Sequence, residues 1–152
     1  MYAPRHYLQF KDFSRAEYEY LFSRTRWIKD KFKRYEPHHP LFDRTLVMIF
    51  EKASTRTRLS FEAGMHQLGG KAIVLEPGKG AWPIEFDDNV VMDGEPEEHV
   101  REVARVLSRY VDAIAVRAFP KFQRWEVDRE DRVIQSFARH ATVPVINMET
   151  IT

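Results

Sequence analysis

Four short apolar runs, separated by segments with helical periodicity, constrain the fold of this 152-residue chain more than any other feature. The runs cover residues 45–50, 72–75, 113–116 and 143–147, and their continuous hydrophobic character is typical of strands buried on both faces. Helices are expected between them at about 55–68, 100–109 and 128–140. This alternation predicts an α/β fold, in which helices cover both faces of a parallel sheet of about four strands in three layers.

A further helix is predicted before the first strand. Ser14 to Glu17 form a capping-box sequence, and apolar residues then recur at helical spacing as far as about Arg34. We expect this helix to pack on another part of a structure through this stripe. Its members are Tyr18, Leu21, Phe22, Thr25, Ile28 and Phe32.

Residues 76–96 form a long connection without periodicity, rich in glycine, proline and aspartate, around an isolated Trp82. Connections of this length in compact domains are usually functional or mobile. We therefore expect this segment to be either functional or mobile.

Length and composition narrow the class of protein. One domain is expected, and 43% hydrophobic with 31% charged residues is typical of a globular chain. No apolar run reaches bilayer length, and the first residues lack the apolar stretch of a secretory signal, so neither a membrane association nor secretion is predicted. The absence of cysteine excludes disulfides and fits a cytoplasmic location. A net charge of +1, from 24 basic and 23 acidic residues, argues against nucleic-acid binding.

Residues 50–62 join the first predicted strand to a helix start that is crowded with anion-binding groups. Helix N-termini present unpaired N–H groups and a partial positive charge, which suit a phosphate. Ser54, Thr55 and Thr57 add hydroxyl donors, and Arg56 and Arg58 add guanidinium groups. The alternative interpretation is a Ser/Thr N-cap followed by a solvated arginine face, which needs no ligand.

Three features lie at the carboxyl ends of predicted strands. Residues 54–58 follow the first strand, Arg117 ends the third, and Glu149 comes just after the fourth. Ligands of open parallel sheets bind at that edge, so these groups are expected to form one site. The order of the strands is not given by the sequence.

The motif at residues 50–62, Phe-Glu-Lys-x-Ser-Thr-Arg-Thr-Arg-x-Ser-Phe-Glu, resembles the phosphate-binding signature of the carbamoyltransferase family, which includes ornithine and aspartate carbamoyltransferases. The resemblance runs from about residue 7 to residue 152 and implies the N-terminal, carbamoyl phosphate-binding domain. It implies carbamoyl transfer to an ornithine-type amine in arginine biosynthesis, without a cofactor. The implied phosphate ligands are Ser54, Thr55, Arg56 and Thr57; Arg117 would polarise the carbonyl oxygen, and Arg56, Thr57 and Arg117 would be catalytic.

Within that family, residues 77–86, 119–122 and 147–150 are most like the N-acetylornithine carbamoyltransferases. This resemblance implies that Trp82 reaches the carbamoyl phosphate of a neighbouring subunit in a homotrimer. It also implies that Glu149 and Glu97 lie at the acyl-ornithine. Residues 51–55, in contrast, have the form found in ornithine carbamoyltransferases, so both N-acetylornithine and ornithine stay open as the acceptor.

The family continues beyond this point into a His-Pro-x-Gln motif and a second domain that binds the amino acid, and neither is in residues 1–152. We therefore expect a single carbamoyl phosphate-binding domain that is inactive as an isolated fragment. A stand-alone module that binds a phosphorylated metabolite without catalysis is an alternative, and an aspartate carbamoyltransferase domain is a more distant one. No metal site is predicted, because the spacing of the histidines matches no usual ligand pattern and cysteine is absent.

Overall fold

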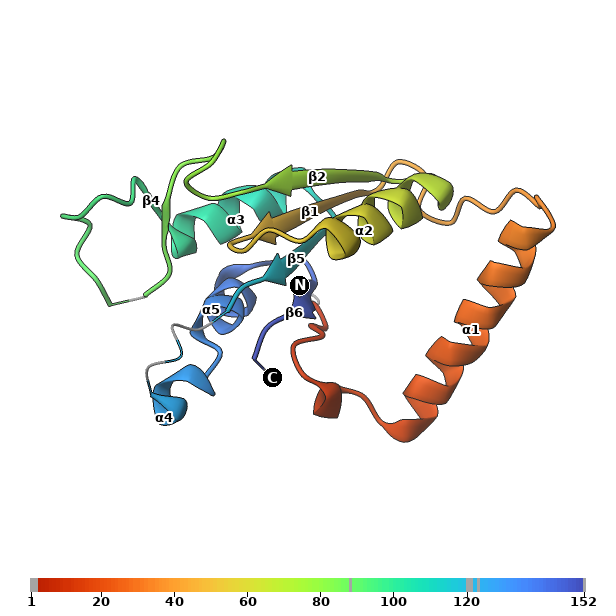
Figure 1. Ribbon diagram of the computed structural model, residues 1–152, viewed down its shortest axis with the longest axis horizontal. Helices are drawn as coiled ribbons and strands as arrows, with labels where there is room; N and C mark the ends of the chain where they lie inside the picture. Colours follow the sequence, from red (N-terminus) through yellow and green to blue (C-terminus); the bar gives the residue numbers. More distant parts are fainter. Residues whose placement is uncertain (1–2, 88, 120–121, 123, 152) are drawn as a thin grey trace.

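The computed structural model describes residues 3–87, 89–119, 122 and 124–151, so Pro120, Lys121 and Thr152, which contribute to the resemblance, lie outside the described residues. Figure 1 shows the arrangement of the elements. In chain order they are the 3₁₀ turn η1 (Phe10–Asp12), α1 (Arg15–Lys33), β1 (Thr45–Phe50), α2 (Thr55–Gln67), β2 (Lys71–Leu75), β3 (Ile84–Glu85), β4 (Glu98–His99), α3 (Val100–Tyr110), β5 (Ala113–Arg117), α4 (Trp125–Asp128), α5 (Arg132–His140) and β6 (Val145–Glu149).

The central sheet has four parallel strands in the order β2-β1-β5-β6. Ile49 of β1 lies opposite Leu75 of β2 and Val116 of β5, so the carboxyl ends of these strands meet at one edge. The predicted α/β class and the parallel four-stranded sheet are confirmed. The strand order also shows that β1 and β5 are direct neighbours. The predicted site residues 54–57 follow β1, and Arg117 is the last residue of β5.

Helices cover both faces of this sheet, as predicted. On one face, Val47 and Ile49 of β1 pack in a buried cluster with Val100 of α3 and Phe137 of α5. On the other face, Met48 and its neighbours on β1 pack with side chains of α2. Alternate residues of β1 thus enter different layers, which is why its sequence is apolar at every position.

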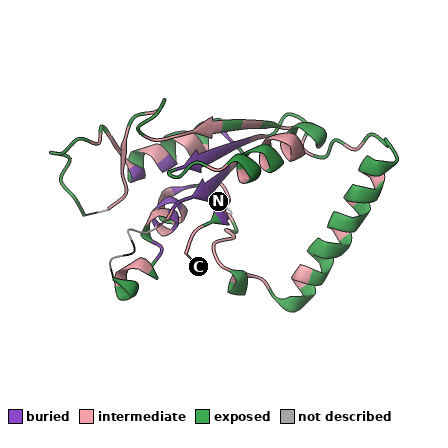
Figure 2. Cartoon of the chain, viewed as in Figure 1, coloured by how far each residue is buried: buried purple, intermediate pink, exposed green. Residues whose placement is uncertain are grey.

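The helix α1 forms as predicted but does not pack as predicted. The Ser14 hydroxyl accepts a hydrogen bond from the Glu17 amide, and the Glu17 carboxylate accepts one from the Ser14 amide, which is the expected capping box. No residue of α1 is buried, and Phe22 and Phe32 of its apolar stripe are 57% and 58% exposed. In Figures 1 and 2 the helix stands apart from the sheet. The expected packing of the stripe is therefore not seen within the described chain.

The expected helix at 128–140 corresponds to α5, which begins only at Arg132, after the short α4 and a turn. Asp131 separates them because it adopts a left-handed conformation with a φ of 50°, and its buried carboxylate accepts a hydrogen bond from the Thr150 hydroxyl. A left-handed residue cannot continue a right-handed helix. The break thus depends on a contact 19 residues away, which periodicity does not reveal.

Two further expectations about strands were wrong in detail. The fourth strand begins at Val145 rather than at residue 143, since Pro144 has no N–H and contributes only its carbonyl, which accepts from Ile114. The connection at 76–96 also contains β3, which pairs in parallel with the short β4. Two-residue strands are too short to show an alternating sequence pattern, and they form only where a partner strand is present.

An N-terminal segment extends the sheet beside β6. The Tyr7 amide donates to the Val145 carbonyl at 2.9 Å, and the Asn147 amide donates to the Tyr7 carbonyl at 2.8 Å. The ring nitrogen Nδ1 of His6 accepts from the Val145 amide at 3.1 Å, and burial lowers the pKa of His6 below its usual value. The segment thereby occupies the open edge of β6.

The helices of the described residues include none that is both long and apolar enough to cross a membrane. In the same residues, no group of three or more metal-ligating side chains lies together.

Candidate functional site

The turn between β1 and α2 presents the amino end of a helix at the carboxyl edge of the sheet. Ser54 is the N-cap of α2, and its hydroxyl accepts from the Thr57 amide at 3.3 Å. The amides of Thr55 and Arg56 meet no acceptor within the described chain. Unpaired amides and the positive end of the helix dipole together favour an anion at this turn.

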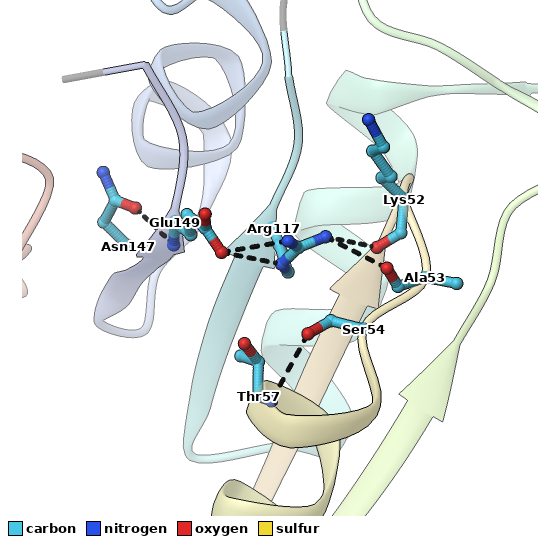
Figure 3. A network of polar contacts seen from close by, with 7 residues as sticks. All are labelled: Lys52, Ala53, Ser54, Thr57, Arg117, Asn147 and Glu149. Carbon is cyan, nitrogen blue, oxygen red and sulfur yellow. Dashed lines mark hydrogen bonds and ion pairs between the residues drawn. The ribbon is translucent and has the colours of Figure 1, made fainter.

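Arg117, the last residue of β5, lies opposite Phe50 and beside this turn. Alternation along β5 directs its side chain to the face that α2 covers, and the residue is only 9% exposed. Its Nη1 donates to the carbonyls of Lys52 and Ala53 at 2.8 and 3.3 Å (Figure 3). The guanidinium is therefore anchored to the backbone that leads into the helix.

Glu149 holds the other side of the same guanidinium. One carboxylate oxygen, Oε2, accepts from Nε of Arg117 at 3.1 Å and from Nη2 at 2.9 Å. A guanidinium has five N–H groups, so these contacts and the two backbone contacts leave one Nη2 N–H for a ligand. The arrangement offers a single, oriented cationic donor next to the helix terminus.

An aromatic ring also faces this cation. The Cζ atom of Arg117 lies 4.9 Å from the centroid of the Phe119 ring, and Nζ of Lys52 lies 5.3 Å from it. Both distances are typical of cation–π contacts. Sequence reasoning assigned no role to Phe119 or Lys52, although Lys52 stands inside the recognised motif and Phe119 follows Arg117 by two positions.

The two arginines of the motif differ in their surroundings. Arg58 pairs with Glu62 at 3.3 Å and with Glu76 at 3.7 Å, so it fits the alternative interpretation of a solvated arginine face. Arg56 is exposed and has no ion pair within the described residues. Of the two, Arg56 is the cation whose charge no carboxylate of the described chain compensates.

Trp82 and Glu97 do not join the groups around Arg117. The Trp82 side chain is 60% exposed on the 76–96 connection and has no hydrogen bond or ring contact within the described residues. Glu97 is exposed directly before β4, with no ion pair in that same part of the chain. Their suggested roles, toward a second subunit and toward an acceptor, stay predictions.

A cavity of about 520 Å³ lies beside the site rather than at it. Its lining includes Glu51 and Phe119 together with Asp131 from the turn before α5, but none of residues 54–57 and not Arg117. Outside this cavity, Thr55 and Arg56 at the start of α2 are exposed, whereas Arg117 is only 9% exposed.

Comparison with protein families gives a match over nearly the whole chain. The model described as the carbamoyl-P binding domain of aspartate/ornithine carbamoyltransferase matches residues 5–152. Among curated relatives, the N-acetylornithine carbamoyltransferase of Xanthomonas campestris pv. campestris is 55% identical over 148 residues, which are 97% of this chain and 42% of that protein. The ornithine carbamoyltransferase of Aromatoleum aromaticum is 57% identical over 147 residues, 97% of this chain and 41% of that protein.

Solved structures give the same picture. A crystal structure of acetylornithine transcarbamylase complexed with acetylcitrulline is 55% identical and superposes with a TM-score of 0.89, covering 97% of this chain and 43% of that one. The chain thus spans about two fifths of the length of the relatives that it matches.

Proposed function

Because the chain belongs to the aspartate/ornithine carbamoyltransferase family, as its carbamoyl phosphate-binding domain, we propose that it binds carbamoyl phosphate at the amino end of α2 for transfer of the carbamoyl group to an ornithine-type amine. The observation that carries this proposal is the Arg117 guanidinium, which is held against the Lys52 and Ala53 carbonyls directly beside that helix terminus. The family and domain expected from residues 50–62 are confirmed.

The proposed chemistry needs positive charge rather than a covalent intermediate. A neutral amine attacks the carbamoyl carbon, and negative charge grows on the carbonyl oxygen. The bond to phosphate then breaks, phosphate leaves with the bonding electron pair, and the proton lost by the amine goes to the departing phosphate. Residues 54–57 bind the phosphate, with Arg56 compensating its charge. The remaining Nη2 N–H of Arg117 donates to the carbonyl oxygen, and one such preorganised donor contributes about 3 kcal/mol to lowering a barrier of this type.

The acceptor is N-acetylornithine or ornithine. The resemblance of residues 77–86, 119–122 and 147–150 favours N-acetylornithine, with Glu149 and Glu97 toward the acyl-ornithine. Relatives of both names are similar to the chain, at 55% and 57% identity, so overall identity does not separate them. Steady-state rates with each amine, measured on a full-length protein that contains this domain, decide between them.

Since the chain spans about two fifths of its relatives, we propose that catalysis in arginine biosynthesis belongs to a longer protein with a second, amino acid-binding domain. The 152-residue chain alone is then expected to bind carbamoyl phosphate and to form little citrulline-type product. We further propose a cytoplasmic homotrimer in which Trp82 reaches a neighbouring site. Light scattering of the longer protein, with and without Trp82→Ala, measures the assembly.

Calorimetric titration with carbamoyl phosphate tests the site. Arg56→Ala and Arg117→Ala are expected to weaken binding by tenfold or more, on the scale of a lost charge-assisted hydrogen bond. Arg58→Ala is the matched control, because it removes an arginine from the same helix whose partners are Glu62 and Glu76. Unchanged affinity in both test variants, with thermal melts that show folded protein, refutes the proposed site.

A further inference from the structure

The side chain of Asn147 on β6 has hydrogen bonds at both ends of its amide. Its Nδ2 donates to the Leu8 carbonyl and to the Thr150 hydroxyl, each at 2.7 Å. Its Oδ1 accepts from the Glu149 amide at 2.8 Å. The backbone amide of Asn147 is bonded to Tyr7, so the residue is fixed from the N-terminal segment on one side and from the end of β6 on the other.

The backbone at Glu149 has an unusual shape that this amide supports. Glu149 has a φ of 137°, a region that L residues rarely adopt. The pairing of β6 with β5 also shifts register here, because Val116 pairs with Asn147 but Arg117 pairs with Glu149. Met148 is the extra residue of a β-bulge, a device that redirects a side chain at a strand end. The side-chain oxygen Oδ1 of Asn147 accepts a hydrogen bond from the backbone amide of Glu149, the residue that follows the bulge.

The bulge determines which side chain faces Arg117. In regular pairing Met148 would lie opposite Arg117, whereas the shifted register brings Glu149 there, within 2.9 Å of Nη2. Figure 3 shows Asn147, Glu149 and Arg117 in a line that leads to the turn before α2. One carboxylate oxygen of Glu149 accepts hydrogen bonds from both Nε and Nη2 of Arg117. A small displacement of Glu149 would therefore rotate the plane of the Arg117 guanidinium.

We propose that Asn147 is a positioning residue of this site: it keeps the Glu149 backbone in its bulged conformation and thereby orients the Arg117 guanidinium toward the carbonyl oxygen of the ligand. This inference rests on the proposed function and adds a residue that touches neither the phosphate nor the carbamoyl group. Asn147 acts through Glu149, and its effect is on the recognition of the carbamoyl group rather than of the phosphate.

Two probes separate these contributions in the 152-residue chain. Inorganic phosphate reports on the helix terminus alone, and carbamoyl phosphate also reports on Arg117. We expect Asn147→Leu, which is similar in size but lacks both hydrogen-bonding groups, to lower the preference for carbamoyl phosphate over phosphate about tenfold. Phosphate affinity itself should change less than about twofold. Asn147→Asp keeps an acceptor for the Glu149 amide and should retain most of the preference.

A strand control and a direct probe of the arginine complete the experiment. Val145→Ala removes a fully buried side chain from β6 without touching the amide contacts of Asn147, so it should lower the melting temperature and leave the preference unchanged. In the ligand-free protein, the Nε–H NMR signal of Arg117 should shift in Asn147→Leu and stay near its original position in Asn147→Asp.

The possible failures are distinguishable. If the unmodified chain prefers carbamoyl phosphate and Asn147→Leu keeps that preference with an unmoved Arg117 signal, the positioning role is wrong and the proposed function stands. If the unmodified chain shows no preference, the proposed function fails, and the Arg117 signal alone then decides whether Asn147 orients the guanidinium. A shift of that signal in Val145→Ala equal to the shift in Asn147→Leu also overturns the inference, because any weakening of β6 would then suffice.

Discussion

The helices α5 and α1 both carry a predicted apolar stripe but end in opposite environments. Phe137 of α5 is fully buried against the sheet, whereas Phe32 of α1 is 58% exposed. The helix α1 ends within one residue of its expected end, whereas α5 begins at Arg132 rather than at the expected residue 128 and ends at His140 as expected. The pattern therefore specifies a helix in each region, and the presence of a facing layer decides whether its apolar side chains are buried.

This difference distinguishes two regions of the molecule: the buried sheet, which positions the residues of the candidate site, and the exposed helix α1, which does not. The turn before α2 follows β1, and Arg117 is the last residue of β5; both strands are buried from both faces. The contacts that tie down the start of α1 are local and exposed, such as the capping box and the ion pair between Arg5 and Glu17. Substitutions in the two regions should therefore have different consequences.

The largest expected effect is from truncating a buried aromatic side chain. Phe137→Ala should lower the free energy of unfolding by about 3–5 kcal/mol, because it removes the burial of a ring and leaves a cavity between α5 and the sheet. The matched change in α1, Phe32→Ala, should cost less than about 0.5 kcal/mol. Urea denaturation of both variants measures this difference, and equal losses would show that α1 is packed in solution.

A second comparison, within the sheet, concerns the strained backbone at the end of β6. Glu149→Ala and Glu149→Gly both remove the carboxylate partner of Arg117, so both should destabilise the protein. Glycine adopts a φ of 137° without strain, so Glu149→Gly should be about 1 kcal/mol more stable than Glu149→Ala. Thermal unfolding of the pair measures the difference. Equal stabilities would mean that the backbone relaxes once the carboxylate is gone.

Periodicity and composition predicted the elements that carry their own pattern. The strand at Thr45–Phe50 has the expected bounds, and the helix that follows ends one residue from its expected end. The elements that were missed depend on distant partners. The break before α5 needs the Thr150 hydroxyl on Asp131, and the pairing of β3 with β4 needs two segments that are separated along the chain.

The candidate site divides in the same way. The position of residues 54–57 and Arg117 at one edge could be predicted because the strand ends of a parallel sheet meet there, and Arg117 does lie beside Glu149 at that edge. Asn147 and Phe119 could not be assigned from their residue types. Asn147 contacts Glu149 beside a β-bulge, and Phe119 contacts Arg117 through the orientation of its ring. Neither feature can be predicted from the spacing of residues in the sequence.

A smaller effect tests whether α1 unfolds independently. Ser14→Ala removes the N-cap of α1 and should cost about 1 kcal/mol of helix stability. Because α1 has no buried residue, the loss should appear as faster hydrogen exchange in α1 amides alone. Amides of β1 and β5 should exchange at their original rates. Equal acceleration in the sheet would show that α1 and the sheet unfold as one unit.

The smallest expected effect concerns the N-terminal segment, which lies between the two regions. His6 accepts a hydrogen bond from the Val145 amide through Nδ1, which requires the neutral ring, and burial lowers the pKa of His6 below its usual 6.5. The unfolded chain therefore binds more protons than the folded chain in the window just below that value, so stability rises with pH there. The contribution of His6 is fully present above about pH 6.5 and is lost as pH falls through the lowered pKa.

The substitution His6→Gln isolates this contribution, because a glutamine carbonyl oxygen can accept from the Val145 amide without titrating. The difference in unfolding free energy between the unmodified protein and His6→Gln should be constant above about pH 7 and should change in favour of the variant toward about pH 5. If the unfolding free energies of the two proteins instead change in parallel between about pH 7 and pH 5, the N-terminal segment detaches from β6 before His6 is protonated. The amide of Asn147, which donates to Tyr7 in the same segment, should then exchange rapidly even at neutral pH.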